Sequence, residues 1–469
     1  MIAAGLPLVA SFVVSLVLAP WFGERVFGIY LLAMTVATFA LIPAKFGIQV
    51  ATSRLLSEHE DDAGNWLRSG LVLRMAFTLP TSAALFALAP FLASRLGGPD
   101  SNAAFAMAAA VVVSTSVFEF ATEALVGLRA FRAQLLIRMV ALALRLAAVF
   151  AVRYGGFPVE IFLVAHSVAF LAPGLVALAV LLFRHRGHTS MAGMRRTLQV
   201  ATPLAFASAS YMIYAHTDRL MIGWMHGPAP VAQFGIARNV IDAALFPIVA
   251  LTWSLRPALV RAFQAGGTAA MRPVLQEGTR LSILYTLLAV GLLAPVGDLI
   301  IPGIYSTDFT AAGLYFVGLL PVLALRALPT VVFPALLALD AQGRYSRLMT
   351  VTAIVNLVLN FALIPRFGAW GAIAATGVAM VGLAAGGIGQ LRAIGCRGFI
   401  RGALSECLPA AAVATVGAIG LVLLRSQQVS WVFLLLAALG YGAVAALLLL
   451  RLQPPRLGYS ANPDPPQTP

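Results

Sequence analysis

The chain has 469 residues, of which 61% are hydrophobic and 10% are charged. Soluble domains are about 45–50% apolar and roughly 25% charged, so this composition excludes a soluble globular protein and predicts an all-α polytopic membrane protein. The net charge of +14 does not call for nucleic acid as a partner, because arginines in cytoplasmic loops account for it in proteins of this class.

About fourteen apolar segments are long enough to cross a bilayer when the chain is divided at polar, Gly and Pro residues. In chain order they cover residues 2–20, 27–50, 70–94, 103–127, 134–153, 158–183, 199–222, 231–255, 278–302, 309–338, 346–364, 370–391, 404–424 and 429–450. The first segment lacks a signal-peptide pattern and is expected to be a mature helix, but it is short and leaves open a start upstream of Met1.

The loop arginines predict the orientation of these segments. Loops after even-numbered segments hold seventeen arginines, whereas loops after odd-numbered segments hold six. Because cytoplasmic loops carry the excess of basic residues, we expect both termini to lie in the cytoplasm.

The two halves of the chain repeat each other in order. "FGIY" from Phe27 recurs as "FGIA" from Phe234, and the same offset of 207 residues matches Arg54 with Arg261. We therefore predict two parallel six-helix lobes, an arrangement typical of carriers with a central cavity. The predicted parts are a first lobe (1–184), a cytoplasmic linker (185–198), a second lobe (199–392), two further helices (393–452) and a disordered proline-rich tail (453–469).

Three basic residues lie deep in their predicted segments. Arg145 and Arg326 are midway along the fifth and tenth segments, and Lys45 lies inside the second. A charge at mid-bilayer costs ~2.5–3.5 kcal/mol even on lenient scales, so such residues are usually functional or paired. We expect these three to line a polar cavity.

Other basic residues lie nearer the segment ends. Arg74, Arg138 and Arg280 are within a turn or two of cytoplasmic ends, where extension of the side chain toward water explains them. Arg256 also lies near a cytoplasmic end, and either extends toward water or lines the cavity.

Two pairs of charges have helical spacing. Arg238 and Asp242 are four residues apart, and form either a local ion pair or a cavity site that opens for an anion. Glu119 and Glu123 could couple transport to protons, but we favour their capping the cluster of arginines at 129–132.

The adjacent charges Asp218 and Arg219 fall at the outer end of the seventh segment. At that depth we expect an interfacial anchor or an outer gate.

The candidate cavity is cationic. Its expected basic residues are Lys45, Arg145, Arg238, Arg256 and Arg326, against one acid, Asp242. Such a cavity attracts anions, and the planar fork of arginine suits phosphate. The sequence has no GxxxxGK[ST] loop, HExxH motif or other metal constellation, so we expect no ATP hydrolysis, cofactor, metal or enzymatic activity.

Three stretches carry a resemblance to a known family. They are "APWFGERVFGIYLLAMTVATFALIPAKFGIQVATSRLLSE", "DRLMIGWMHGPAPVAQFGIARNVIDAALFPIVALTWSLRPALVRAF" and "LLALDAQGRYSRLMTVTAIVNLVLNFALIPRFGAWGAIAAT". In order and spacing they resemble polysaccharide and oligosaccharide flippases of the Wzx type. These flippases belong to the superfamily of multidrug, oligosaccharidyl-lipid and polysaccharide exporters.

The resemblance implies alternating access by two lobes and a cationic cavity at the same five basic positions. The implied cargo is a polyprenyl-pyrophosphate-linked oligosaccharide in a bacterial inner membrane, with membrane lipid, glycosyltransferases and a polymerase as further partners. The first helix lacks the arginine that lipid II flippases carry there, which favours an exopolysaccharide or O-antigen type of cargo.

Two other functions stay open. A cation-coupled multidrug exporter would need an acidic cavity, for which Asp242 and Glu119 are the candidate residues. A membrane polysaccharide polymerase or ligase usually has a large outer loop for catalysis. No outer loop in our assignment exceeds about ten residues, which argues against such an enzyme.

Overall fold

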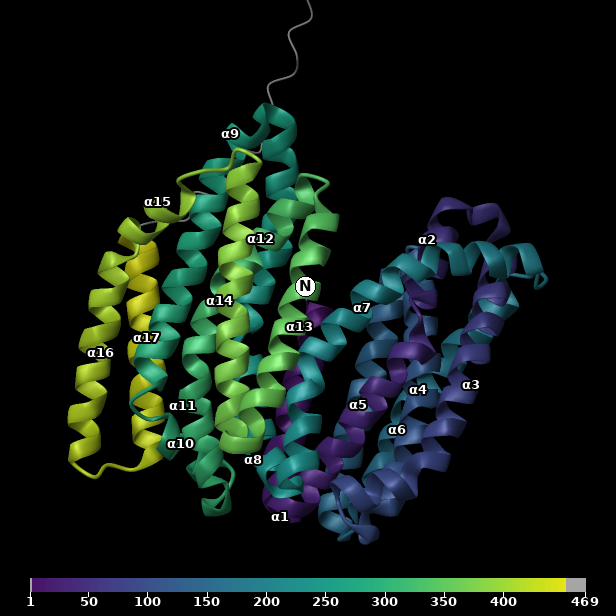
Figure 1. Ribbon diagram of the computed structural model, residues 1–469, viewed down its shortest axis with the longest axis horizontal. Helices are drawn as coiled ribbons and strands as arrows, with labels where there is room; N and C mark the ends of the chain where they lie inside the picture. The colour runs from purple at the N-terminus through teal and green to yellow at the C-terminus, as the bar shows by residue number, and fades with distance from the viewer. Residues whose placement is uncertain (1, 453–469) are drawn as a thin grey trace, which may run out of the picture. The chain divides into compact units, whose positions relative to one another are not determined.

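The computed structural model describes residues 2–452, apart from the side chains of 2–9, 206, 207, 211, 342 and 448–452. Within this range the chain forms seventeen α-helices and three short 3-10 turns, and no strand (Figure 1). The all-α prediction is confirmed. The predicted disordered tail, 453–469, lies outside the described residues.

The helices follow one another with short connections. The first eight are α1 (Ile2–Lys45), α2 (Ile48–Glu58), α3 (Ala63–Leu96), α4 (Asn102–Gly127), α5 (Phe131–Gly155), α6 (Val159–Arg184), α7 (Met191–His226) and α8 (Pro228–Ala244). The others are α9 (Phe246–Leu293), α10 (Gly297–Ile304), α11 (Thr310–Leu325), α12 (Ala327–Ala338), α13 (Gln342–Phe367), α14 (Ala369–Ala393), α15 (Phe399–Glu406), α16 (Leu408–Ser426) and α17 (Trp431–Leu452).

All fourteen predicted segments fall on helices, but helices and predicted segments do not correspond one to one. The first two segments are joined in α1, which bends at Gly23, where a φ of 73° is accessible to glycine at little cost. The second segment also ends earlier than predicted. Lys45 is the last residue of α1, and positive φ angles at Phe46 and Gly47 turn the chain into the separate helix α2.

Nine helical stretches of the described part are long and apolar enough to cross a membrane, one of them formed by α11 and α12 together. A tenth crossing is possible if α8 and α9, which meet at a bend of 41°, are taken as one. The protein is therefore a multi-pass membrane protein. The count falls below fourteen because α1 unites two predicted segments, α7 is not among the nine, α8 and α9 are bent, and the apolar part of α17, Trp431–Leu447, is short.

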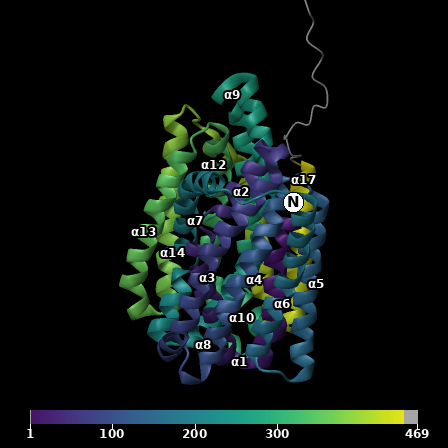
Figure 2. The same cartoon turned by 90° about the vertical axis from the view of Figure 1, so that its right-hand side faces the viewer.

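The chain divides into two compact units. The first contains residues 2–244, 301–319 and 349–379, and the second contains 245–300, 320–348 and 380–452. In the first unit α4 packs against α3 and α6, and α5 packs against α6 (Figure 2). Their core includes Leu67 of α3, Phe120 of α4 and Leu178 of α6. Helix α1 packs closely on α8, since a Cβ at Gly28 would collide with the Pro228 carbonyl.

The second unit is organised around α9, which packs against α12, α15, α16 and α17. Its core includes Met271, Leu336 and Phe399. An ion pair fixes the end of α16, because the Arg425 guanidinium donates to both carboxylate oxygens of Asp298 at 2.9 Å. Unlike the predicted second lobe, which begins at 199, this unit begins after α8, and the two-lobe division stays a prediction.

Candidate functional site

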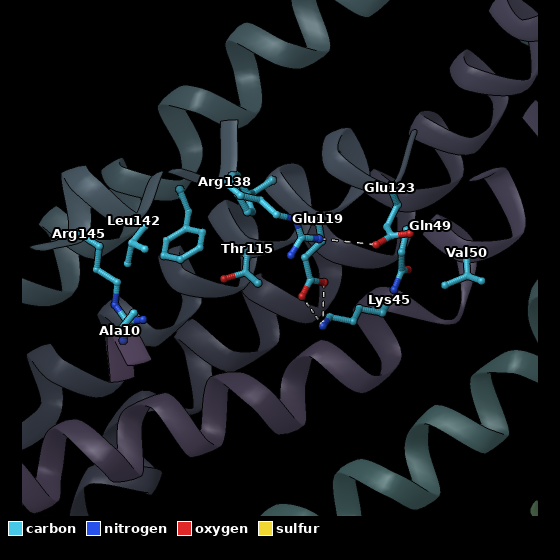
Figure 3. Close-up of a pocket in the computed structure, with 12 residues that line it drawn as sticks. Ala10, Lys45, Gln49, Val50, Thr115, Glu119, Glu123, Arg138, Leu142 and Arg145 are labelled. Atoms are coloured by element: carbon cyan, nitrogen blue, oxygen red, sulfur yellow. Dashed lines mark hydrogen bonds and ion pairs between the residues drawn. The ribbon is translucent and has the colours of Figure 1, made fainter. Parts of the chain in front are cut away.

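A cavity of about 310 Å³ lies inside the first unit, where α1, α2, α4, α5 and α6 meet (Figure 3). Its charged lining consists of Lys45, Glu119, Glu123, Arg138 and Arg145. The remaining wall is largely apolar, and includes Val50, Phe118, Leu142 and Phe170. Three cations thus face two carboxylates in a space large enough for a phosphate-sized group.

The end of α1 positions Lys45 over Glu119 of α4. The Lys45 Nζ lies 2.7 Å from each Glu119 carboxylate oxygen, and dashed lines mark this ion pair in Figure 3. Arg74 approaches the same carboxylate at 3.9 Å and donates to the Gln49 side-chain oxygen at 3.1 Å. Because the break after Lys45 ends the helix, the lysine can face the cavity from the end of α1.

A second pair lies one turn further along α4. The Arg138 guanidinium of α5 is 3.7 Å from Glu123 (Figure 3). Neither glutamate pairs with the arginines at 129–132, since Arg129 pairs with Glu60 at 3.7 Å. Our favoured interpretation of the two glutamates as caps for that cluster is therefore wrong: their partners lie on neighbouring helices that face the cavity.

The expectation that Arg74 and Arg138 extend toward water is also wrong. Arg74 is fully buried, and Arg138 lines the cavity with only 27% of its side chain exposed. Arg280 in the second unit is buried as well, and pairs with Glu277 at 2.7 Å and with Glu406 at 3.6 Å. Arg74 and Arg280 are thus enclosed by packed helices, and Arg138 faces the cavity.

Arg145 differs from the other cations of the cavity. It is 8% exposed, its Nε is buried without a hydrogen-bond partner, and its guanidinium makes no ion pair within the described part of the chain. In Figure 3 its side chain extends from α5 toward Ala10 of α1, with no contact marked to the two pairs. A buried, uncompensated guanidinium is costly unless an anion reaches it.

Arg145 also lines a second cavity of the first unit, of about 180 Å³. The other polar groups of this lining are the hydroxyls of Ser11, Ser15, Tyr30, Thr35 and Thr38, and the side chains of His216, Arg219 and Asn239. Arg219 donates to the Asn239 side-chain oxygen at 3.2 Å. Arg145 therefore stands at the wall of two polar cavities, and Arg219 adds a second guanidinium to one of them.

Arg238, by contrast, is compensated by two carboxylates. It lies 3.3 Å from Asp218 of α7 and 3.4 Å from Asp242 of α8. Asp218 is 2% exposed and also accepts a hydrogen bond from the Arg219 backbone amide at 2.8 Å. The packing of α7 against α8 buries this carboxylate against Arg238, so Asp218 is no exposed anchor, and its role as an outer gate stays a prediction.

The remaining two predicted residues belong to the second unit. Arg256 is exposed on α9, and Arg326 is half-buried at the junction of α11 and α12. Neither lines the two cavities above, and their place in a substrate cavity stays a prediction.

Sequence reasoning missed Gln49, Thr115 and Arg138 of the first cavity and His216 and Asn239 of the second. In the sequence these residues are marked only as polar side chains in apolar segments. Such a side chain can line a cavity or contact a neighbouring helix, and the sequence does not distinguish the two. Among the described residues no group of three His, Cys, Asp or Glu side chains could hold a metal ion.

The fold and these cavities define a class: a multi-pass helical membrane protein with polar, arginine-bearing cavities inside one unit. The family described as "Polysaccharide biosynthesis protein" matches residues 1–263, more than half of the chain. The chain belongs to this family.

Two curated relatives come from Haloferax volcanii. The chain is 25% identical to the probable flippase AglR over 383 residues, which cover 76% of this chain and 75% of the relative. It is 21% identical to the probable low-salt glycan biosynthesis flippase Agl15 over 357 residues, covering 76% and 74%.

Solved structures share the fold. The lipid II flippase MurJ in an inward closed conformation has a TM-score of 0.78 at 10% identity, covering 96% of this chain and 98% of MurJ. An inward-facing multidrug transporter of the MATE family has a TM-score of 0.68 at 15% identity, covering 84% and 95%. The resemblance to flippases of this exporter superfamily is confirmed.

Proposed function

We propose that the protein is a flippase that carries a lipid-linked oligosaccharide across the membrane for polysaccharide biosynthesis. The buried Arg145, without an ionic partner in the described residues and shared by two polar cavities, carries the proposal. Family membership and the flippase names of the two relatives support it.

The cargo we propose is a polyprenyl-pyrophosphate-linked oligosaccharide. Its diphosphate supplies the anion that the Arg145 guanidinium lacks, and the five N–H donors of arginine can grip two oxygens at once. The hydroxyl groups and the Asn239 amide of the second cavity suit a sugar, which offers many donors and acceptors. The lipid tail would remain in the bilayer.

The ion pairs around Arg145 give the anion a way to be held and released. Lys45 and Arg138 are neutralised by Glu119 and Glu123, so they add little attraction until a phosphate competes with those carboxylates. A phosphate that takes over Lys45 or Arg138 leaves Glu119 or Glu123 without its cation, so the carboxylate competes to recover that cation and favours release of the anion.

Movement of the cargo requires alternating access, which we assign to two six-helix lobes of residues 1–184 and 199–392 joined by the linker 185–198. The proposed substrate cavity would be lined by Lys45, Arg145, Arg238 and Asp242, and completed by Arg256 and Arg326. We propose Asp218, Arg219, Glu119 and Glu123 as gating or coupling residues.

The proposed setting is a bacterial inner membrane with both termini in the cytoplasm, as the loop arginines predict. Glycosyltransferases and a polymerase of the same pathway would supply and consume the cargo. Transport of this kind requires no covalent step by the chain itself.

One observation favours a second candidate, a cation-coupled multidrug exporter. Glu119 and Glu123 line the first cavity, and MATE transporters share the fold. Both carboxylates are paired with cations of the protein, however, which leaves little free negative charge for a cationic drug.

Reconstitution tests the proposal. Purified protein in liposomes should move a polyprenyl-pyrophosphate-linked oligosaccharide to the opposite leaflet, as measured by its sensitivity to an added glycosidase. The same vesicles should not accumulate a cationic dye in exchange for protons. The reverse pattern would favour the multidrug exporter.

A further inference from the structure

A third hollow of the first unit is separate from the two polar cavities. It is a groove of about 570 Å³ between α4, α5 and α6. Leu125 of α4 and Leu181 of α6 are buried in its floor, whereas Val176 and Val180 of α6 are 65% and 46% exposed at its edge. The groove therefore presents an apolar surface along the outside of membrane-spanning helices.

One end of the groove is cationic. Arg184 and His185, at the end of α6, line it there, and their side chains make no hydrogen bond or ion pair within the described part of the chain. Glu60 also lines this end, but it lies 3.7 Å from Arg129, which offsets its charge. The free charge at this end is positive.

The length of the groove matches one leaflet. Its lining on α6 runs from residue 176 to residue 185, which at 1.5 Å per residue is about 14 Å. Half of a hydrocarbon core of about 30 Å is about 15 Å. A molecule with its head at Arg184 would thus reach the middle of the bilayer from the arginine-rich side of the chain.

We propose that this groove binds an anionic glycerophospholipid, with its phosphate at Arg184 and His185 and an acyl chain between α5 and α6. The charge at one end and the apolar lining along one leaflet match this class of lipid. A polyprenyl chain is far longer than the groove, which argues against the cargo as the occupant.

The groove uses a different face of α5 from the first cavity. Ile137 faces the groove, while the next residue, Arg138, lines the cavity together with Arg145. A lipid seated in the groove would hold α5 against α6 without entering the transport site. The proposal does not depend on the identity of the cargo.

Native mass spectrometry of the purified full chain tests this site, with phosphatidylglycerol and phosphatidylcholine of identical acyl chains as probes. A basic residue near the membrane surface contributes enough attraction for about fivefold tighter binding of an anionic lipid. We expect at least about that preference for phosphatidylglycerol in the wild type. The double variant Arg184→Gln, His185→Gln should abolish it, while Arg186→Gln, a neighbour outside the groove, should leave it intact.

A second variant tests the apolar part. Ala133 is exposed on α5 and lines the groove, so Ala133→Trp should fill it and lower binding of both lipids. Leu136→Trp, 65% exposed and outside the lining, is the matched control. Unchanged phosphatidylglycerol binding in both groove variants would overturn the site. Displacement of phosphatidylglycerol by a lower concentration of polyprenyl phosphate would overturn the proposed occupant.

Discussion

Replacing Arg145 by glutamine should slow transport strongly without unfolding the protein. A hydrogen bond to a charged group contributes about 1.5–3 kcal/mol, so loss of one contact to the diphosphate should slow transport about 10- to 150-fold. The free energy of unfolding should not fall, and removal of the costly buried charge should raise it. The reason is that Arg145 has no carboxylate partner among the described residues that its removal would leave unpaired.

The assay is transport of a lipid-linked oligosaccharide in liposomes, normalised to the amount of protein and compared with thermal unfolding in detergent. Arg132→Gln is the matched control, because Arg132 is an exposed arginine of the same helix. The transport rate of Arg145→Lys should fall between those of the wild type and Arg145→Gln, since lysine keeps the charge but lacks the planar fork of arginine. Full transport in Arg145→Gln, or a large loss of stability with normal transport per folded molecule, would refute the assignment.

Lys45→Met and Glu119→Gln should each lower the free energy of unfolding. The double variant should lose less stability than the sum of the two single losses, with a coupling energy of about 1–3 kcal/mol measured by thermal unfolding in a double-mutant cycle. Additive losses would contradict the 2.7 Å ion pair. Arg326→Ala should reduce export while membrane levels stay normal, as measured by transport per molecule, and unchanged export would remove Arg326 from the cavity. Cys396 and Cys407 are both buried. Maleimide should therefore label neither thiol quickly in the folded protein and both after detergent denaturation. Rapid labelling of the folded protein would contradict this burial.

The class of fold could be predicted because composition and segment length depend on the bilayer rather than on tertiary contacts. Every predicted segment falls on a helix for this reason. The joining and breaking of segments could not be predicted, since they depend on single residues such as Gly23 and Gly47, whose positive φ angles appear only in the structure.

The candidate site was predicted only where a charge lay deep in an apolar segment. That rule found Lys45 and Arg145, because their depth alone makes them costly in lipid. It failed for the partners. Glu119 pairs with Lys45 across 74 residues, whereas helical spacing reports only neighbours within one helix.

Asp218 is a second residue whose partner could not be predicted from the sequence. Its place near a predicted helix end suggested the membrane surface, yet the packing of α7 against α8 brings it to Arg238, twenty residues away in sequence. Depth along a helix can be estimated from sequence, but the side of the helix that faces another helix cannot.

The central claim is that this protein moves a lipid-linked oligosaccharide from the inner to the outer leaflet. The most direct test labels that lipid with a membrane-impermeant sugar probe, in cells with and without the protein. We expect the labelled lipid to disappear from the outer leaflet and to accumulate on the cytoplasmic side when the protein is absent. An unchanged distribution between the two leaflets would contradict it.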